Sequence, residues 1–254
     1  MTEPAQAQQP STVLGAVTPR TPPARLGVAV VHDLVEAIVT GEVQPGAVLP
    51  PEGVLSQTFG VSRTVIRESV KRVEEKGLLT VAQGRGTSVN EASAWNVLDP
   101  VVLSALVEHD DSLGILDELA VVRGVLEGSM ASAAAGRRTT ERTEALQHAL
   151  DHMAETIDDF EAYSQADVDF HFTVMDQSGT RLAPTITRIL FDRARESSRF
   201  TGAPREEALR LTLDEHQAVL DAIEAGDAEG AQRAMQHHIA EAWARRRLPT
   251  ARDA

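Results

Sequence analysis

Residues 50–77 read PPEGVLSQTFGVSRTVIRESVKRVEEKG, and this stretch decides the fold of the first part of the chain. Pro50 and Glu52 suit the first turn of a helix, because a missing N–H is tolerated there and a carboxylate meets the positive end of the helix dipole. Gly60 ends that helix, and Ser62, only two residues later, is a good N-cap for the next one. The pattern therefore predicts two helices joined by a very short turn.

The flanking sequence completes a small domain. Residues 26–40 carry apolar side chains at helical spacing and are followed by a glycine, which predicts a helix before the pair. Residues 78–81 and 87–89 are expected to be strands joined by a turn at residues 83–84. Three helices followed by a hairpin form a winged helix-turn-helix, which is a DNA-binding arrangement.

One face of the third predicted helix, which runs to Lys76, is basic. Its core-facing positions are Val65, Ile66, Val70 and Val73. Arg63, Arg67 and Lys71 recur at i, i+4 and i+8 on another face, with Thr64 beside them. Packing does not require these cations, and they suit phosphates and base edges. A solvated basic face is the alternative, but the short turn and the hairpin favour DNA binding.

At these residues the chain resembles the GntR family of bacterial transcription regulators. The matching positions are Gly41, Pro45, Gly46, Leu49, Pro50, Leu55, Phe59, Gly60, Val61, Ser62, Arg63, Arg67, Glu68, Gly77, Leu78, Gly84, Gly86 and Val89. The resemblance implies that Arg63, Thr64 and Arg67 contact operator DNA. It also implies that Gln83 and Gly84, at the tip of the wing, lie at the minor groove.

Three further residues bear on the predicted DNA surface. Ser62, at the start of the third helix, and Lys71, on its basic face, are assigned to this surface as well. Gly53 departs from the family pattern, because the family usually has Arg directly after the Glu of Leu-Pro-x-Glu. A customary DNA contact is therefore missing. The sequence leaves open whether the operator differs from the usual one of the family.

Acidic residues are concentrated in the later part of the chain. The 254 residues include 38 Asp or Glu and 24 Lys or Arg, which gives a net charge of −14. Residues 25–90 carry seven basic and seven acidic side chains, and Arg20 balances Glu3, so residues 91–254 hold the whole excess. Two regions of such different charge suggest two domains with separate tasks.

Composition also bounds the class of protein. Cysteine is absent, which excludes disulfides and thiolate ligands and suits a cytoplasmic protein. All apolar runs are shorter than the roughly 18 residues that a membrane-spanning helix needs, so no membrane association is expected. Residues 1–24 contain five prolines and no apolar core, so they are expected to form a disordered tail and not a secretory signal.

Residues 112–248 show only helical periods, with residues 91–111 as the linker before them. The expected helix breaks are Gly136, Gly179, Gly202 and Gly226, and the first apolar row is Ile115, Leu119, Val122, Leu126 and Met130. Short connections favour an antiparallel bundle. The predicted fold class is therefore mainly α: a winged helix-turn-helix at residues 25–90, then an all-α helical bundle at residues 112–248.

Helical periodicity separates the histidines into two groups. His148 and His152 stand at i, i+4, a spacing that could hold a metal, but they lie off the apolar row of their helix and are expected in solvent. His237 is likewise expected to point outward. His216 and His238 instead fall on the apolar rows of two later helices.

Asp167 and His171 join the inward-facing group, at i, i+4 on a helix that is expected to be buried all round. Asp167, His171, His216 and His238 would be costly in one core unless they were paired or coordinated. One carboxylate and three imidazoles suit Zn²⁺ in the first place, and also Mn²⁺, Ni²⁺ or Co²⁺, with positions open for an anionic ligand. A satisfied core side chain explains any one of these residues, but the four together favour a metal site.

This region also resembles the FCD-type ligand-binding domain of the FadR subfamily within the GntR family. The matching residues are Arg123, Glu127, Asp167, Phe170, His171, Glu215, His216, Ala222, Ile223, Gly226, Asp227 and His238. Family members with this Asp/His set hold a divalent metal that helps to bind a small carboxylate, so the resemblance implies such an effector. Residues 95–100 resemble the linker of members that respond to sugar acids such as galactonate.

Arg123 has two interpretations. It lies next to the first apolar row and could hold the carboxylate of an effector with two hydrogen bonds. Alternatively, it forms an exposed i, i+4 ion pair with Glu127. The sequence leaves both open.

These observations predict a homodimeric transcription regulator, a repressor that a small carboxylate, in the first place a sugar acid, releases from operator DNA. The ligand is expected to change the spacing of the two DNA-binding heads. The chain is not expected to be an enzyme. A metal-dependent hydrolase and a pure metal sensor using the same Asp/His site are the alternatives, although no carboxylate occupies a recognisable general-base position.

Overall fold

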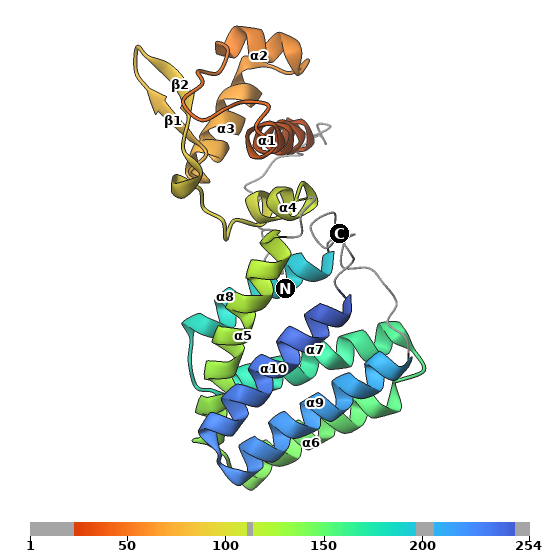
Figure 1. Cartoon of the computed structure of the whole chain (residues 1–254). Helices are drawn as coiled ribbons and strands as arrows, with labels where there is room; N and C mark the ends of the chain where they lie inside the picture. Colours follow the sequence, from red (N-terminus) through yellow and green to blue (C-terminus); the bar gives the residue numbers. More distant parts are fainter. Residues whose placement is uncertain (1–22, 111–113, 197–205, 247–254) are drawn as a thin grey trace, which may run out of the picture.

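The computed structural model describes residues 23–110, 114–196 and 206–246. Over these residues a small N-terminal domain with a two-stranded sheet lies at one end of a long helical bundle (Figure 1). In chain order the elements are α1 (Pro23–Val39), α2 (Glu52–Thr58), α3 (Arg63–Glu75), β1 (Leu79–Ala82), β2 (Gly86–Val89), η1 (Ala92–Ala94), α4 (Pro100–Glu108), α5 (Gly114–Ala135), α6 (Thr140–Glu155), α7 (Phe160–Gln177), α8 (Leu182–Glu196), α9 (Glu206–Ala225) and α10 (Ala228–Arg246). Residues 1–22 of the expected tail and the expected break at Gly202 lie outside the described residues.

The N-terminal domain is the predicted winged helix-turn-helix. The side chain of Ser62 accepts a hydrogen bond from the N–H of Val65, so the predicted N-cap of α3 is confirmed. The three helices and the hairpin share one core, formed by Val30, Leu34, Val35, Ile38, Leu55, Ile66, Val70, Val73, Leu79 and Val89 among others. Val65, which was expected in this core, is only half-buried.

The wing is an antiparallel hairpin of β1 and β2. Its register runs from Leu79 opposite Val89 to Ala82 opposite Gly86. The turn between the strands includes Gly84, whose φ of 78° is in the left-handed region that glycine adopts without strain. The exposed tip of the wing therefore projects beyond the core of the domain (Figure 1).

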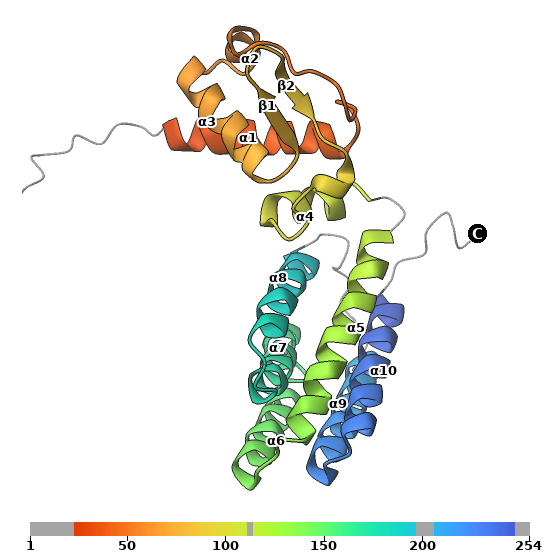
Figure 2. The same ribbon diagram turned by 90° about the vertical axis from the view of Figure 1, so that its left-hand side faces the viewer.

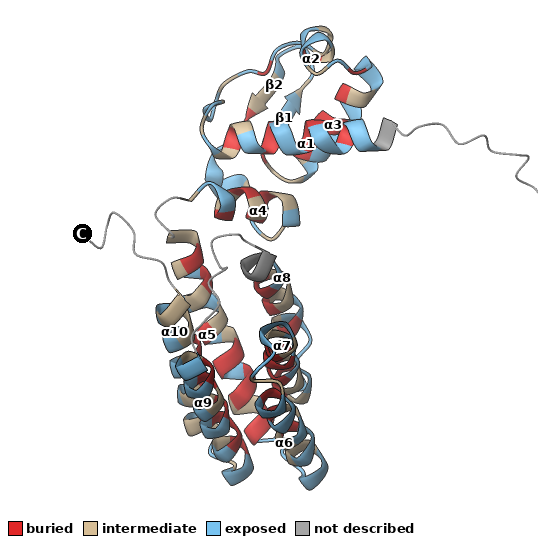
Figure 3. Ribbon diagram, turned by 90° about the vertical axis from the view of Figure 1, so that its right-hand side faces the viewer, coloured by how far each residue is buried: buried red, intermediate tan, exposed pale blue. Residues whose placement is uncertain are grey.

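The C-terminal helices α5 to α10 form the predicted bundle (Figure 2). α5 packs against α7, α8, α9 and α10, while α6 packs against α7 and α9. Figure 3 shows that the buried residues of these helices face one another along the bundle. The largest core cluster contains Leu146, Leu150, Met153, Tyr163, Phe170, Val174, Leu209, Leu220, Ile223, Met235 and Ile239.

The predicted apolar row of α5 is wrong at two positions. Val122 is 43 % exposed and Leu126 is only half-buried, whereas Glu127 is 1 % exposed. The inner face of α5 instead follows Leu116, Leu119, Glu127 and Met130. The positions of the apolar residues predicted the wrong inner face for this helix. The true inner face carries a charged side chain, while the outer face carries valines.

α7 is less buried than the sequence indicated. Its inner side chains are buried as expected, but Gln165 and Asp169 are exposed and Phe172 is only half-buried. One narrow face of α7 therefore lies in solvent, and the side chain of Gln165 donates a hydrogen bond to Asp169 along it. The prediction of a helix buried all round is wrong in this respect.

The predicted linker contains a helix, α4, that packs against both domains. Asp99 caps it by accepting hydrogen bonds from the N–H groups of Val101 and Val102. One side of α4, with Val102 and Ala105, joins the core of the N-terminal domain. Its other side, with Leu103 and Val107, clusters with Leu116 and Leu119 of α5 and Leu190 of α8. α4 therefore connects the two domains physically.

We expect Gly77→Ala to destabilise the N-terminal domain. Gly77 has a φ of 81°, and a Cβ there would collide with the carbonyl oxygen of Ala94 in the following segment. The strained backbone alone should cost about 1–3 kcal/mol. Thermal unfolding followed by circular dichroism measures this loss. Gly136→Ala is the matched control, because the added Cβ would meet only ordinary contacts; an equal loss in both variants would contradict the explanation.

Candidate functional sites

The predicted DNA surface lies on the solvent side of α3 and at the tip of the wing. Arg63, Thr64, Arg67 and Lys71 are exposed, whereas Ile66, Val70 and Val73 of the same helix are buried. Gln83 and Gly84 are exposed at the turn between β1 and β2. The structure thus places all of these residues, with Ser62 at the start of α3, where a nucleic acid can reach them.

The start of α2 supports the two arginines of this surface. Arg67 forms an ion pair with Glu52 at 2.8 Å, a contact that was not predicted from the sequence. The guanidinium of Arg63 lies against Gly53, where an added Cβ would stand 3.2 Å from its Nη2 atom. Arg63 therefore occupies space that a side chain at position 53 would otherwise enter.

Four predicted metal ligands come together in the bundle, from three helices. Asp167 and His171 lie on α7, His216 on α9 and His238 on α10, and all four residues are buried. One ligand atom from each lies within 4.8 Å of the others. His148, His152 and His237 are exposed, as the helical periodicity predicted.

Two glutamates, the buried Glu127 and the half-buried Glu215, contact the imidazoles of this cluster. Glu127 Oε2 lies 2.6 Å from His171 Nδ1, although the contact departs from a linear hydrogen bond, and His238 Nδ1 lies 2.9 Å from Glu215 Oε2. A carboxylate so close to Nδ1 favours the ring proton at that nitrogen. In the neutral rings of His171 and His238, Nε2 therefore carries the lone pair.

These lone pairs point at one another. His171 Nε2 lies 3.2 Å from His238 Nε2 and 3.3 Å from His216 Nε2. With both Nδ1 positions protonated, the contact between His171 and His238 brings two lone pairs together, which a cation would stabilise. Three nitrogens bound at about 2.0–2.1 Å to one ion lie roughly 2.9–3.4 Å apart. The residues therefore fit a divalent metal of the kind the sequence predicted.

Burial keeps two of the imidazoles in the form that binds metal. Burial, together with the neighbouring imidazoles His238 and His171, holds the pKa of His216 well below its usual value, so that ring is neutral. Burial also lowers the pKa of His238, against the opposing effect of Glu215. Neutral imidazoles are the form that coordinates metal ions.

Each glutamate is also paired with an arginine. Burial alone would raise the pKa of Glu127, but Arg123 and His171 hold it at about 2. Burial likewise opposes the effect of His238 and Arg245 on Glu215, and the resulting pKa is again about 2. Arg245 contacts both carboxylate oxygens of Glu215 at 2.7 Å. Two Arg–Glu–His chains therefore end at imidazoles of the cluster, one at His171 and the other at His238.

Arg123 combines features of both interpretations that the sequence left open. Its Nε donates a hydrogen bond to Glu127 Oε1 at 2.7 Å, so the i, i+4 pair forms, but Glu127 is buried and the side chain of Arg123 is only 12 % exposed. The guanidinium also lies 4.2 Å from the ring centroid of Phe191. Arg123 thus reaches a pocket beside the Asp/His cluster while it is held by Glu127.

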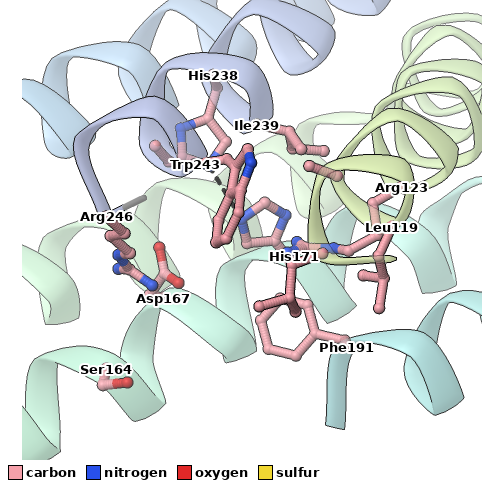
Figure 4. A pocket seen from close by; sticks show the side chains of 13 residues that line it. Leu119, Arg123, Ser164, Asp167, His171, Phe191, His238, Ile239, Trp243 and Arg246 are labelled. Carbon is pink, nitrogen blue, oxygen red and sulfur yellow. Dashed lines mark hydrogen bonds between the residues drawn. The ribbon is translucent and has the colours of Figure 1, made fainter. Parts of the chain in front are cut away.

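This pocket lies among α5, α7, α8 and α10. Figure 4 shows Asp167 beside Arg246 on one side of this space and Arg123 on the other, with His171 and Trp243 between them in this view. Its lining residues are Leu116, Leu119, Ala120, Arg123, Ser164, Asp167, His171, Phe191, His238, Ile239, Ala242, Trp243 and Arg246. One part of the lining is charged and polar and the rest is apolar, which suits a small anionic organic molecule.

Comparison with known families agrees with both halves of the structure. Residues 26–89 match the family described as bacterial regulatory proteins, gntR family, and residues 118–241 match the FCD domain. The Galactonate operon transcriptional repressor of Escherichia coli (strain K12) is 30 % identical over 83 % of this chain and 92 % of that protein. The chain belongs to the GntR family. It is therefore a DNA-binding transcription regulator with an FCD domain, and not an enzyme, as the sequence predicted.

Other relatives of this GntR regulator extend the comparison. The HTH-type transcriptional regulator LutR of Bacillus subtilis (strain 168) is 29 % identical over 80 % of this chain and 92 % of that protein. A solved structure titled "Lar controls the expression of the Listeria monocytogenes agr system and mediates virulence" has the same fold, with a TM-score of 0.53. It is 19 % identical and covers 87 % of this chain and 95 % of that one. None of the described helices of the GntR regulator is both long and apolar enough to span a membrane.

Glu127 and Glu215 were not predicted from the sequence to contact the histidines of the cluster. Glu127 stands four residues after Arg123, and Glu215 directly precedes His216, so both were visible next to candidate residues. Glu127 stands eight residues after Leu119 and three before Met130, so helical spacing places it on the same face as these two residues. The predicted row passed through Val122 and Leu126 instead, which left Glu127 off the inner face. No local pattern indicates that Glu215 contacts a histidine on another helix.

We expect the purified GntR regulator to contain about one divalent ion per chain, measured by elemental analysis after dialysis. His216→Ala should lose the ion, because it removes one of four converging donors. His148→Ala is the matched control and should keep it, since His148 is exposed on α6. Retention of the ion in His216→Ala with its loss in His148→Ala would contradict the assignment.

Proposed function

We propose that this GntR regulator is a repressor that leaves its operator when a small carboxylate enters the pocket beside Asp167 and the three histidines. The observation that carries the proposal is the convergence of the imidazole Nε2 atoms next to a pocket that contains Arg123. The named function of the galactonate repressor supports the same direction of control.

In this proposal α3 and the wing bind the operator. Arg63, Thr64 and Arg67 contact base edges and phosphates, and Lys71 contacts the phosphate backbone. Ser62 places the N-terminus of α3, where backbone N–H groups favour a phosphate. Gln83 and Gly84 approach the minor groove from the tip of the wing. The exposure of these residues supports the assignment.

Asp167, His171, His216 and His238 would hold a divalent metal, in the first place Zn²⁺, with Mn²⁺, Ni²⁺ or Co²⁺ as alternatives. When bound, the metal supplies a Lewis-acidic centre with positions open to an oxygen ligand. Glu127 and Glu215 keep the Nε2 lone pairs of His171 and His238 directed toward that centre. The chemistry of the donor set therefore supports an anionic effector.

We infer that the effector is a small hydroxy-carboxylate, in the first place a sugar acid. Arg123 can give charge-assisted hydrogen bonds to its carboxylate while Glu127 holds the other edge of the guanidinium. Phe191 and Trp243 offer aromatic surfaces to the C–H groups of the carbon chain. A long acyl chain fits poorly beside Asp167 and the imidazoles.

α4 offers a route from the pocket to the DNA surface. Phe191 lines the pocket, and the adjacent Leu190 packs against Leu103 and Val107 of α4. The N-cap of α4, Asp99, pairs with Lys76, which directly follows α3, at 2.6 Å. A ligand that shifts α8 therefore favours one orientation of the DNA-binding domain over another.

The proposed functional unit is a cytoplasmic homodimer. A single helix-turn-helix contacts one short half-site. Two copies of the chain are therefore needed to bind both half-sites of a two-fold operator at their fixed separation. Val121, Val122 and Val125 of α5 are exposed on the side away from the bundle core, and a second copy would cover them. Ligand binding then changes the distance between the two heads, and operator affinity falls.

We expect Arg67→Ala to weaken operator binding by roughly 10- to 100-fold, because a bidentate base contact is lost. Gel-shift titration at fixed salt measures the change. The fold should be unaffected, since Arg67 is exposed. Arg233→Ala on α10 removes the same charge from an exposed position in the other domain and serves as the control. Equal affinities of Arg67→Ala and the wild type would overturn the assignment.

The effector proposal predicts that sugar acids raise the melting temperature of the metal-loaded protein. A concentration about 100 times the Kd should raise it by roughly 5–10 °C, and less after metal removal. Arg123→Lys should lose most of this response. It keeps a positive charge beside the buried Glu127 but lacks the planar fork.

The controls separate this effector from its alternatives. Arg181→Lys makes the same change at an exposed position outside the pocket and should respond like the wild type. Calorimetric titration with fatty acyl-CoA thioesters should give no binding. Binding of acyl-CoA together with no binding of sugar acids would overturn the proposal. Release of DNA by metal alone would identify a pure metal sensor instead.

A further inference from the structure

The ion pair between α2 and α3 has a defined geometry. Arg67 Nε donates to Glu52 Oε1 at 2.9 Å, and Arg67 Nη2 donates to Glu52 Oε2 at 2.8 Å. Glu52 therefore holds the side-on edge of the guanidinium with two parallel hydrogen bonds. The pair lies on the exposed surface, where the side chains of Arg67 and Glu52 are 70 % and 40 % accessible.

This pairing leaves the other edge of Arg67 available. A guanidinium has five N–H donors, and the side-on contact uses one from Nε and one from Nη2. The two donors that point away from the chain, one on each Nη atom, form the end-on fork. That fork matches the O6 and N7 acceptors of guanine in the major groove.

We propose that Glu52 is a positioning residue for base recognition: it fixes the plane of the Arg67 guanidinium so that the end-on fork faces the DNA. The inference rests on the proposed function, in which Arg67 contacts a base edge. An arginine without such a partner distributes over many rotamers, and ordering it costs free energy on binding. Prior orientation by Glu52 reduces that cost for the base that matches the fork.

The position of Glu52 also allows a purely structural role. It lies in the first turn of α2, where a carboxylate interacts favourably with the helix dipole. Exposed ion pairs contribute little to stability, so this role predicts only a small change in melting temperature. Base discrimination distinguishes the two roles, because a structural contribution does not depend on the DNA sequence.

Glu52→Asp and Glu52→Gln test the proposal in the full chain. Aspartate keeps the charge in the first turn but is too short to pair with Arg67 in the same bidentate way. Glutamine keeps the length and loses the charge, which also removes a repulsion from the phosphate backbone. Glu75→Gln, which removes an exposed charge from α3 near Lys71, is the control for net charge.

The measurement is the ratio of affinities for two DNA duplexes at fixed salt. Selection from a randomised library with the wild-type protein defines the operator, and Arg67→Ala identifies the base pair at which discrimination is lost. The second duplex carries a substitution at that base pair. We expect Glu52→Asp and Glu52→Gln to reduce the affinity ratio by about tenfold, while Glu75→Gln keeps it.

The two glutamate variants should differ in their affinity for non-operator DNA. Glu52→Gln should bind it more tightly than the wild type, because one negative charge is gone, whereas Glu52→Asp should bind it equally well. In an Arg67→Ala background, neither substitution should lower the affinity ratio further. A wild-type ratio in Glu52→Asp, or an equal loss with and without Arg67, would overturn the proposal.

Failure of the underlying assignment has a different signature. If Arg67→Ala leaves discrimination unchanged at every base pair of the operator, Arg67 is not a base reader, and the proposed DNA contact fails together with the role of Glu52. If Arg67→Ala loses discrimination but Glu52→Asp does not, only the positioning role of Glu52 fails.

Discussion

Two Arg–Glu–His chains inside the helical bundle determine how the C-terminal domain is organised. Glu127 and Glu215 are stable as carboxylates inside the bundle because each lies between an arginine and an imidazole. An isolated buried carboxylate would be strongly destabilising. The first chain also connects α5 with α7 through His171, and the second connects α9 with α10. The same contacts that satisfy the buried charges therefore aim the imidazole lone pairs at one point.

This arrangement links the pocket to the cluster without any additional element. Arg123 lines the pocket and donates to Glu127, which in turn contacts Nδ1 of His171. A group that changes the position of Arg123 changes the electrostatic environment of His171 through one intervening side chain. Arg123 also contacts Phe191 of α8, next to Leu190 that touches α4. Ligand, cluster and inter-domain helix are thus neighbours in one contact network.

The sequence predicted those helices and strands that are marked by caps, glycines or apolar periodicity. It did not predict contacts between segments that are distant along the chain. Caps, glycines and apolar periodicity located α3 and the hairpin, and the same periodicity sorted His216 and His238 from His148 and His152. It failed on α5, because Glu127 is buried against His171 of another helix, α7, as well as against Arg123 of its own. It also missed α4, whose cap at Asp99 was read as linker. Burial of a charge depends on tertiary pairing, which local periodicity does not report.

The distribution of charge explains how an acidic chain can act on DNA. Of the net charge of −14, the segment 25–90 contributes nothing, so the DNA-binding domain is not repelled as a whole. Its attraction to phosphates is nevertheless modest, because non-specific affinity rises with the number of uncompensated cations. Glu52 lowers that number further by pairing with Arg67. Binding must therefore draw more on base contacts and on the second copy of the chain, and those are the contributions that a change in the spacing of the heads can remove.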